Sequence, residues 1–120
     1  MPPVKRMLIV EDHERTLHAL GRFFRLMGCE VVTAETVAAA IDSLHPAPDC
    51  VLLDLVLPDG DGEAVLRQVR AEGLATLVAV CTGIDDPDRL EALKGLGPDA
   101  LLLKPLDLDH MLRAYSSMMS

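Results

Sequence analysis

The chain has 120 residues, 50% of them hydrophobic, and a formal net charge of −8 at pH 7. This length suffices for one hydrophobic core and is too short for two, so we expect a single domain over residues 1–120. The acidic balance and the scarcity of aromatic residues argue against nucleic-acid binding, which needs clustered Lys and Arg and, on single strands, rings on which bases stack.

The apolar stretches are too short for a membrane span, which needs roughly 18 to 20 residues, so we expect no membrane association. The first apolar run is followed at once by Glu11 and Asp12, unlike a signal-peptide cleavage region, and a cytoplasmic location is expected. Cys29, Cys50 and Cys81 are far apart and lack C-x-x-C spacing, which favours buried thiols over disulfides or a zinc site.

The first half of the chain alternates continuous apolar runs with apolar residues at helical spacing, which indicates strands and helices in turn. Residues 7–10 form the first strand, and the helix after it ends at Gly28, a typical C-terminal cap. Residues 31–33 form a second strand. The next helix begins near Val37 and stops before Pro46, because the residue preceding a proline disfavours the helical conformation.

The second half repeats this alternation. Residues 50–53 form a strand that runs into Asp54, and a loop over residues 58–62, rich in Pro, Gly and Asp, leads to a helix that Gly73 ends. The later elements, in chain order, are a strand at 77–81, a helix starting with Asp86 and Pro87, a strand at 100–103 and a helix capped by Asp107. Apolar runs this continuous are covered on both faces, so the pattern predicts a three-layer α/β sandwich around a parallel sheet.

Polar side chains collect where the predicted strands end. In an open parallel sheet the ligand site lies at the carboxyl ends of the strands. Carboxylates that face one another repel, and a nearby ammonium group offsets only part of this repulsion. Carboxylate oxygens at a solvent-accessible site are suitable ligands for Mg2+, which would relieve the rest. The residues that directly follow apolar strands are Glu11, Asp12, Asp54, Thr82 and Lys104.

In this order and at these positions, the motifs resemble the receiver domain of bacterial two-component response regulators. The resemblance covers essentially the whole chain and rests on Glu11-Asp12, the run from Asp54 to Gly62, Thr82-Gly83 and Lys104-Pro105. It implies a flavodoxin-like (βα)5 fold, in which a five-stranded parallel sheet of order 2-1-3-4-5 lies between two layers of helices.

The resemblance also implies a phosphorylation switch. Asp54 would accept a phosphoryl group from a phosphohistidine on a histidine kinase or phosphotransfer protein, and Thr82 and Lys104 would contact the phosphoryl oxygens. Such a protein catalyses its own phosphorylation and slow dephosphorylation without being a conventional turnover enzyme. Phosphoryl transfer depends mostly on positioning and electrostatics, which side chains of this kind supply.

Metal binding is part of the same implication. By resemblance, Asp12, Asp54 and the main-chain carbonyl of Val56 would coordinate Mg2+ or Mn2+, and Glu11 would act mostly through water. Thr82 would bond to the phosphoryl group only when it is present, so the loop after Thr82 would have two states, and phosphorylation would select between them.

Some positions depart from the family pattern. Leu101 stands where receivers usually carry the aromatic switch residue, and Val56 and Ile84 are apolar where polar side chains often place an attacking water. We therefore predict a long-lived phosphoryl group. By resemblance alone, the helix from Asp86, the strand at 100–103 and the last helix would form a partner or homodimer surface.

Two other functions remain to be weighed. The chain could be a non-phosphorylated pseudo-receiver that serves as an interaction module. A phosphohydrolase of the haloacid dehalogenase type also uses a strand-end Asp with magnesium, but it needs a second Asp two residues later, where this chain has Val56. The sequence leaves open the cognate kinase, the output, and whether the receiver stands alone or belongs to a longer regulator or hybrid kinase.

Overall fold

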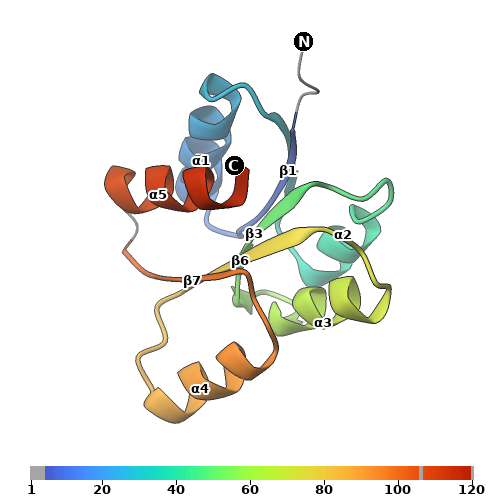
Figure 1. Ribbon diagram of the computed structural model, residues 1–120, viewed down its shortest axis with the longest axis vertical. Coiled ribbons are helices and arrows are strands. Elements are labelled where there is room, and N and C mark those ends of the chain that lie inside the picture. Colours follow the sequence, from blue (N-terminus) through green and yellow to red (C-terminus); the bar gives the residue numbers. More distant parts are fainter. Residues whose placement is uncertain (1–4, 106, 120) are drawn as a thin grey trace.

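The computed structural model describes residues 5–105 and 107–119, without the side chains of Leu108, Ala114, Tyr115 and residues 117–119. Within these residues, five parallel strands form one sheet in the order β2-β1-β3-β6-β7 (Figure 1). Numbered along the chain within this sheet, the order is 2-1-3-4-5, so the predicted flavodoxin-like topology is confirmed. The strands are β1 (Arg6–Val10), β2 (Glu30–Ala34), β3 (Cys50–Asp54), β6 (Leu77–Thr82) and β7 (Ala100–Leu103).

Helices cover both faces of this sheet. Figure 1 shows α1 and α5 together on one side and α2 and α3 on the other, with α4 beside β7. The chain therefore forms the three layers expected from its continuous apolar strands. The helices are α1 (Glu14–Leu26), α2 (Val37–Asp42), α3 (Glu63–Ala71), α4 (Pro87–Gly95) and α5 (Leu108–Met119).

Alternate residues of the central strands feed two separate cores. In β1, Leu8 and Val10 belong to the core covered by α2, α3 and α4, whereas Met7 and Ile9 belong to the core covered by α1. Successive side chains of a strand point to opposite faces, and each fully buried Leu, Ile or Val contributes about 1.5–3 kcal/mol relative to exposure. This two-sided burial makes the sheet a rigid support for the loops at its carboxyl edge.

The helix termini follow local sequence signals, with one difference. Asp86 and Asp107 cap α4 and α5 as predicted, accepting hydrogen bonds from backbone N–H groups of the first turn. Gly28 and Gly73 follow α1 and α3 with positive φ, as expected of C-terminal caps. At α1, however, the cap is His13, which leaves Glu11 and Asp12 outside the helix.

The segment predicted as a loop at residues 58–62 includes the turn and the second strand of a small antiparallel hairpin. Its strands are β4 (Val56–Leu57) and β5 (Gly60–Asp61), and Val56 lies opposite Asp61. Asp59 in its turn accepts hydrogen bonds from the backbone N–H groups of Val37 and Ala38 at 2.8 and 3.1 Å. The loop prediction was wrong here because a contact with the start of α2, distant in sequence, helps to hold the hairpin.

All three cysteines are buried and outside any disulfide, as predicted, and burial raises the pKa of Cys50 to about 11 and that of Cys81 to about 12. Among the described residues, the helices lack the length and apolar character that crossing a bilayer requires. On α5, apolar residues recur at helical spacing, which the sequence alone would assign to the inner face; of these, Leu112 is 38% exposed, and the side chains of Leu108 and Tyr115 lie outside the described residues.

Candidate functional site

Three carboxylates meet at the carboxyl edge of the sheet. Glu11 directly follows β1, Asp12 comes next, and Asp54 is the last residue of β3. One oxygen from each lies within 4.8 Å of the others. Glu11 and Asp54 are buried, at 3% and 7% exposure, whereas Asp12 is exposed. They share an open cleft of about 460 Å³, lined by Glu11, Asp12, His13, Thr16, Asp54, Val56, Gly83 and Lys104.

Lys104 supplies a positive charge to this cluster. Its backbone N–H donates to the carbonyl oxygen of Thr82 at 2.8 Å, which fixes the residue at the end of β7. The Nζ atom lies 3.1 Å from Glu11 Oε2 and 3.3 Å from Asp54 Oδ2. Burial alone would lower the pKa of Lys104, but its contacts with Glu11 and Asp54 outweigh burial and raise it. The ammonium group therefore stays protonated between the two carboxylates.

One ammonium group leaves the acidic cluster with excess negative charge. Burial, and then the charge of Asp54, raise the pKa of Glu11, although Lys104 and the backbone N–H of His13 partly offset them. The ionised form of Glu11 is therefore less favourable here than in water. A donor set of carboxylate oxygens around an open cleft fits a hard divalent cation, which would relieve this repulsion.

The segment after Asp54 turns back beside its carboxylate. The backbone N–H of Val56 points at Asp54 Oδ1, at a long 3.4 Å, and the Val56 side chain is 70% exposed at the cleft. Two residues after the strand end, where a haloacid dehalogenase needs its second carboxylate, the chain thus presents an apolar side chain to solvent.

The two predicted switch residues lie on neighbouring strands. Thr82 ends β6 and is buried, and its Oγ1 accepts the backbone N–H of Ile84 at 3.0 Å. The cleft lining includes its neighbour Gly83. Leu101 on β7 is opposite Val80 and packs, partly buried, against the same core as Ile84. Both residues are thus tied to the segment that leads into α4.

With this geometry in view, comparisons with known proteins identify the family. The family model of the response regulator receiver domain matches residues 7–116. The chain belongs to this family. It is thus a receiver domain of the kind used in two-component signalling, and its fold and the strand-end positions of its polar residues agree with that membership.

Relatives and solved structures place the receiver in context. It is 35% identical over 108 residues to the transcriptional regulatory protein KdpE of Mycobacterium tuberculosis, covering 88% of this chain and 47% of that protein. It is 32% identical over 103 residues to a cyclic di-GMP phosphodiesterase of Thermotoga maritima, covering 86% and 28%. The signal receiver domain of a putative LuxO repressor from Vibrio parahaemolyticus superposes with a TM-score of 0.90 at 25% identity, covering 98% and 91%. The receiver thus spans less than half the length of these two curated relatives.

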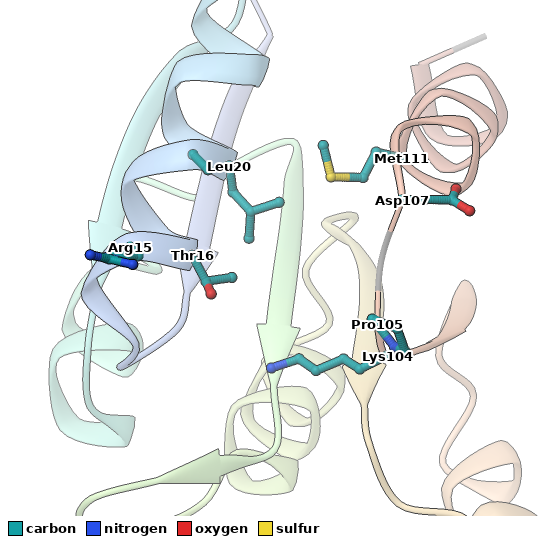
Figure 2. A pocket seen from close by; sticks show the side chains of 8 residues that line it. Arg15, Thr16, Leu20, Lys104, Pro105, Asp107 and Met111 are labelled. Atoms are coloured by element: carbon teal, nitrogen blue, oxygen red, sulfur yellow. The ribbon is translucent and has the colours of Figure 1, made fainter.

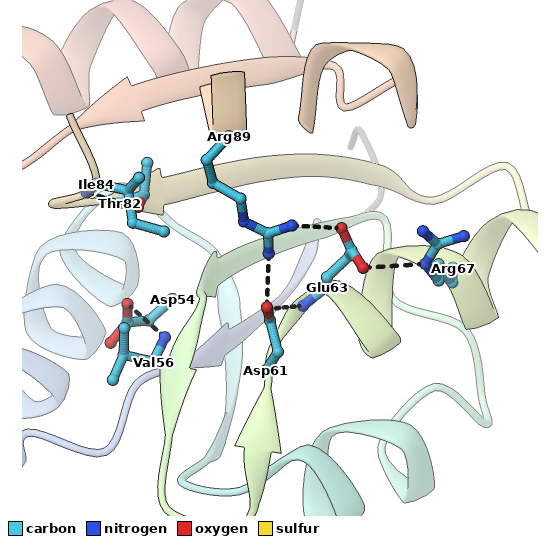
Figure 3. A network of polar contacts seen from close by, with 8 residues as sticks. All are labelled: Asp54, Val56, Asp61, Glu63, Arg67, Thr82, Ile84 and Arg89. Carbon is cyan, nitrogen blue, oxygen red and sulfur yellow. Dashed lines mark hydrogen bonds and ion pairs between the residues drawn. The ribbon is translucent and has the colours of Figure 1, made fainter. Parts of the chain in front are cut away.

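A network of ion pairs near the receiver's acidic cleft was missed by sequence reasoning (Figure 3). Arg89 on α4 contacts Asp61 on β5 and Glu63 on α3, and Glu63 also pairs with Arg67. Arg89 and Asp61 are 28 positions apart, so no local pattern signals their contact. Charged residues at i and i+4, as in Glu63 and Arg67, were the one part that spacing could have indicated.

A second and larger hollow adjoins the acidic cleft of the receiver. It has a volume of about 700 Å³ and lies between α1 and α5, and Figure 2 shows Lys104 reaching past it toward the end of β3. It shares Thr16 and Lys104 with the cleft. Its lining is Arg15, Thr16, Ala19, Leu20, Lys104, Pro105, Asp107 and Met111.

Proposed function

We propose that this receiver is a phosphorylation-dependent signalling switch in which Asp54 accepts a phosphoryl group from the phosphohistidine of a histidine kinase or phosphotransfer protein. The observation that carries the proposal is the convergence of Glu11, Asp12 and Asp54 within 4.8 Å, with Lys104 bridging two of them. Ordinary helix caps or turn residues would have no reason to meet in this way, since like charges at such distances repel.

In the proposed reaction, a carboxylate oxygen of Asp54 attacks the phosphorus. A bond forms between this oxygen and phosphorus, the bond between phosphorus and the histidine nitrogen breaks, and its electron pair stays with the imidazole. Lys104 is placed to contact a phosphoryl oxygen, because its Nζ already lies 3.3 Å from Asp54 Oδ2. Positioned charge of this kind is what phosphoryl transfer mainly requires.

The metal in this proposal is Mg2+ or Mn2+. Asp12, Asp54 and the main-chain carbonyl of Val56 would hold it, and it would neutralise charge on the carboxylates and on the transferred group. Glu11 already binds Lys104 through Oε2 and the His13 N–H through Oε1, at 3.1 and 3.3 Å. These contacts favour the water-mediated role proposed for Glu11, because both of its oxygens are already engaged.

Thr82 and Leu101 would carry the response. The Thr82 oxygen accepts a hydrogen bond from Ile84, while its hydroxyl proton remains available for a phosphoryl oxygen. Turning the hydroxyl toward Asp54 would pull on the segment from Gly83 to Asp86, which precedes α4. Leu101, packed on the same core as Ile84, would move with that segment in place of the usual aromatic ring.

The competing functions have less support. A pseudo-receiver that is never phosphorylated has no need for three carboxylates clustered around the Lys104 ammonium group. A haloacid dehalogenase mechanism needs a carboxylate where the exposed Val56 side chain stands. We therefore place phosphorylation first.

The proposal treats residues 1–120 as one receiver domain, in the cytoplasmic location expected from the sequence, without direct nucleic-acid binding by these residues. The surface of α4, β7 and α5 remains a proposed partner or homodimer face. Leu103 on β7, at 55% exposure, supports this, because large apolar side chains at the surface often mark contact sites.

The decisive experiment is labelling with acetyl phosphate, followed by intact mass measurement, with and without Mg2+. We expect wild-type protein to gain one phosphoryl group only with Mg2+, and Asp54→Asn to gain none. Asp42→Asn, on α2 away from the cleft, is the matched control and should label like wild type. Absence of labelling and of beryllofluoride binding in wild type would favour the pseudo-receiver instead.

A further inference from the structure

Arg89 connects helix α4 to the β4–β5 hairpin, which follows Asp54, and to the start of α3. The guanidinium group of Arg89 lies 2.5 Å from Asp61 Oδ2 and 3.0 Å from Glu63 Oε1 (Figure 3). The Arg89 and Glu63 side chains are only 28% and 19% exposed, so their contact is shielded more than an ordinary surface ion pair, whereas the Asp61 side chain is 54% exposed. Two nitrogens of one planar group thus hold two carboxylates from two different elements.

The two carboxylates are themselves fixed. Asp61 Oδ1 accepts the backbone N–H of Glu63 at 2.9 Å, and Glu63 Oε2 binds Arg67 Nε at 3.1 Å. Burial alone would raise the pKa of Glu63, but Arg67 and Arg89 outweigh burial and lower it, so Glu63 stays ionised at neutral pH. Arg89 therefore docks onto a preformed acidic pair.

Through this pair, Arg89 reaches the hairpin beside Asp54. Asp61 is the cross-strand partner of Val56, whose N–H points at Asp54 Oδ1 and whose carbonyl is a proposed metal ligand. The hairpin strands have only two residues each, so their own hydrogen bonds hold them weakly. The position of Val56 thus depends on outside contacts, and Arg89 supplies one of them.

The same contact matters to α4. In this helix Leu93 is buried, Leu90 packs partly buried against the same core, and residues 85–88 at its start are exposed. A helix with few buried apolar contacts belongs to the part of a fold that moves at low free-energy cost. The Arg89 ion pairs therefore form a larger share of the contacts that hold α4 than they would for a deeply packed helix.

We propose that Arg89 is a positioning residue that joins α4 to the β4–β5 hairpin, so that metal binding at Asp54 and the position of α4 are coupled. This inference rests on the proposed roles of Asp54 and Val56. Asp54 would then be coupled to α4 by two routes, one through the Thr82 hydroxyl and one through the Arg89 ion pairs. The second route matters because this receiver has Leu101 in place of the aromatic residue that usually takes part in the first.

The test compares Arg89→Gln with Arg67→Gln, which removes a guanidinium from the same Glu63 without touching α4. Calorimetry measures Mg2+ affinity, and amide spectra of 15N-labelled protein follow residues 56–62 and α4, before and after Mg2+ and beryllofluoride. In Arg89→Gln we expect amides 56–62 to exchange faster even without metal, Mg2+ to bind roughly fivefold more weakly, and α4 amides to lose their response to the metal. Arg89→Lys should restore part of each effect, and Arg67→Gln, which leaves Arg89 in contact with both carboxylates, should not weaken Mg2+ binding and should keep the α4 response to the metal.

The sign of the affinity change separates positioning from simple electrostatics. Removing a cation near an acidic site would by itself tighten Mg2+ binding, so weaker binding points to lost positioning. Unchanged or tighter binding in Arg89→Gln, with α4 amides still responding, would overturn the inference while leaving the proposed function intact. If wild-type protein itself binds neither Mg2+ nor beryllofluoride, the proposed function fails, and the inference fails with it.

Discussion

Gly62 lies so close to Asp54 that a Cβ atom at position 62 would stand 2.2 Å from the carbonyl oxygen of Asp54. Gly62 also donates its backbone N–H to the Leu55 carbonyl at 2.7 Å. Its φ of −59° is ordinary for any residue, so glycine is required here by close approach of two backbones and not by conformation. The start of α3 can therefore pack directly against the end of β3.

Gly62→Ala should distort the site and destabilise the fold. The new methyl group meets backbone, which has to shift, and overpacking of this kind costs about 1–3 kcal/mol. Urea denaturation measures the loss of unfolding free energy, and beryllofluoride binding reports on the site. Gly95→Ala is the control, because a Cβ there meets nothing within 4 Å. A Gly62→Ala protein as stable as wild type would show that the two backbones separate easily.

Lys104→Gln should affect metal binding and phosphorylation in opposite directions. Without the ammonium group, Glu11 and Asp54 lose their counter-charge, so we expect tighter Mg2+ binding by calorimetry. Labelling by acetyl phosphate should nevertheless slow by about 10²–10³, the usual loss when one stabilising donor is removed from a transition state. Lys94→Gln, on the exposed side of α4, removes the same charge elsewhere and should change neither quantity. Parallel losses of both would mean that Lys104 merely supports the fold.

The central strands and the site edge were predictable because their signals are local. Continuous apolar runs such as residues 7–10 identify strands buried on both faces, and parallel strands end at a common edge, which is why Glu11 and Asp54 meet. The hairpin was not predictable, because its turn residue Asp59 contacts a helix start 22 positions earlier.

The cap of α1 shows a different limit. Asp is strongly preferred at an N-cap position, yet the cap is His13, and Asp12, one residue earlier, lines the cleft. Local preference does not decide which of two neighbouring residues caps a helix when one of them belongs to a carboxylate cluster. Likewise, the Arg89 contacts arise only once α3, β5 and α4 have packed. The roles assigned to the site residues remain predictions.

Asp59 gives the structure a measurable acid sensitivity. Its hydrogen bonds with the backbone N–H groups of Val37 and then Ala38 lower its pKa below the ordinary value of 3.8. Because the folded pKa is depressed, this contribution to stability is present above pH 3.8 and is lost as the pH falls through the lower folded value. Asp59→Ala should therefore lower the melting temperature by a few degrees at neutral pH, and the difference from wild type should shrink in acid.

Thermal unfolding of wild type and Asp59→Ala across the acid range measures this difference. Glu35→Gln, just before α2, is the control for losing one exposed carboxylate and should show no such trend. A gap between wild type and Asp59→Ala that stays constant down to strongly acidic pH would mean that the carboxylate charge contributes nothing to the cap.

The apolar residues at positions 56 and 84 predict a phosphoryl group that persists for minutes or longer. The exposed Val56 side chain lines the cleft and Ile84 packs on the core, so neither offers a polar atom to hold an attacking water. Val56→Gln should shorten the half-life roughly ten- to a hundredfold by supplying such a group, as measured by acid-quenched phosphate release after removal of acetyl phosphate. Val56→Ala keeps the position apolar and should retain the wild-type lifetime. A wild-type half-life of seconds, or equal rates for Val56→Gln and Val56→Ala, would show that these side chains do not control hydrolysis.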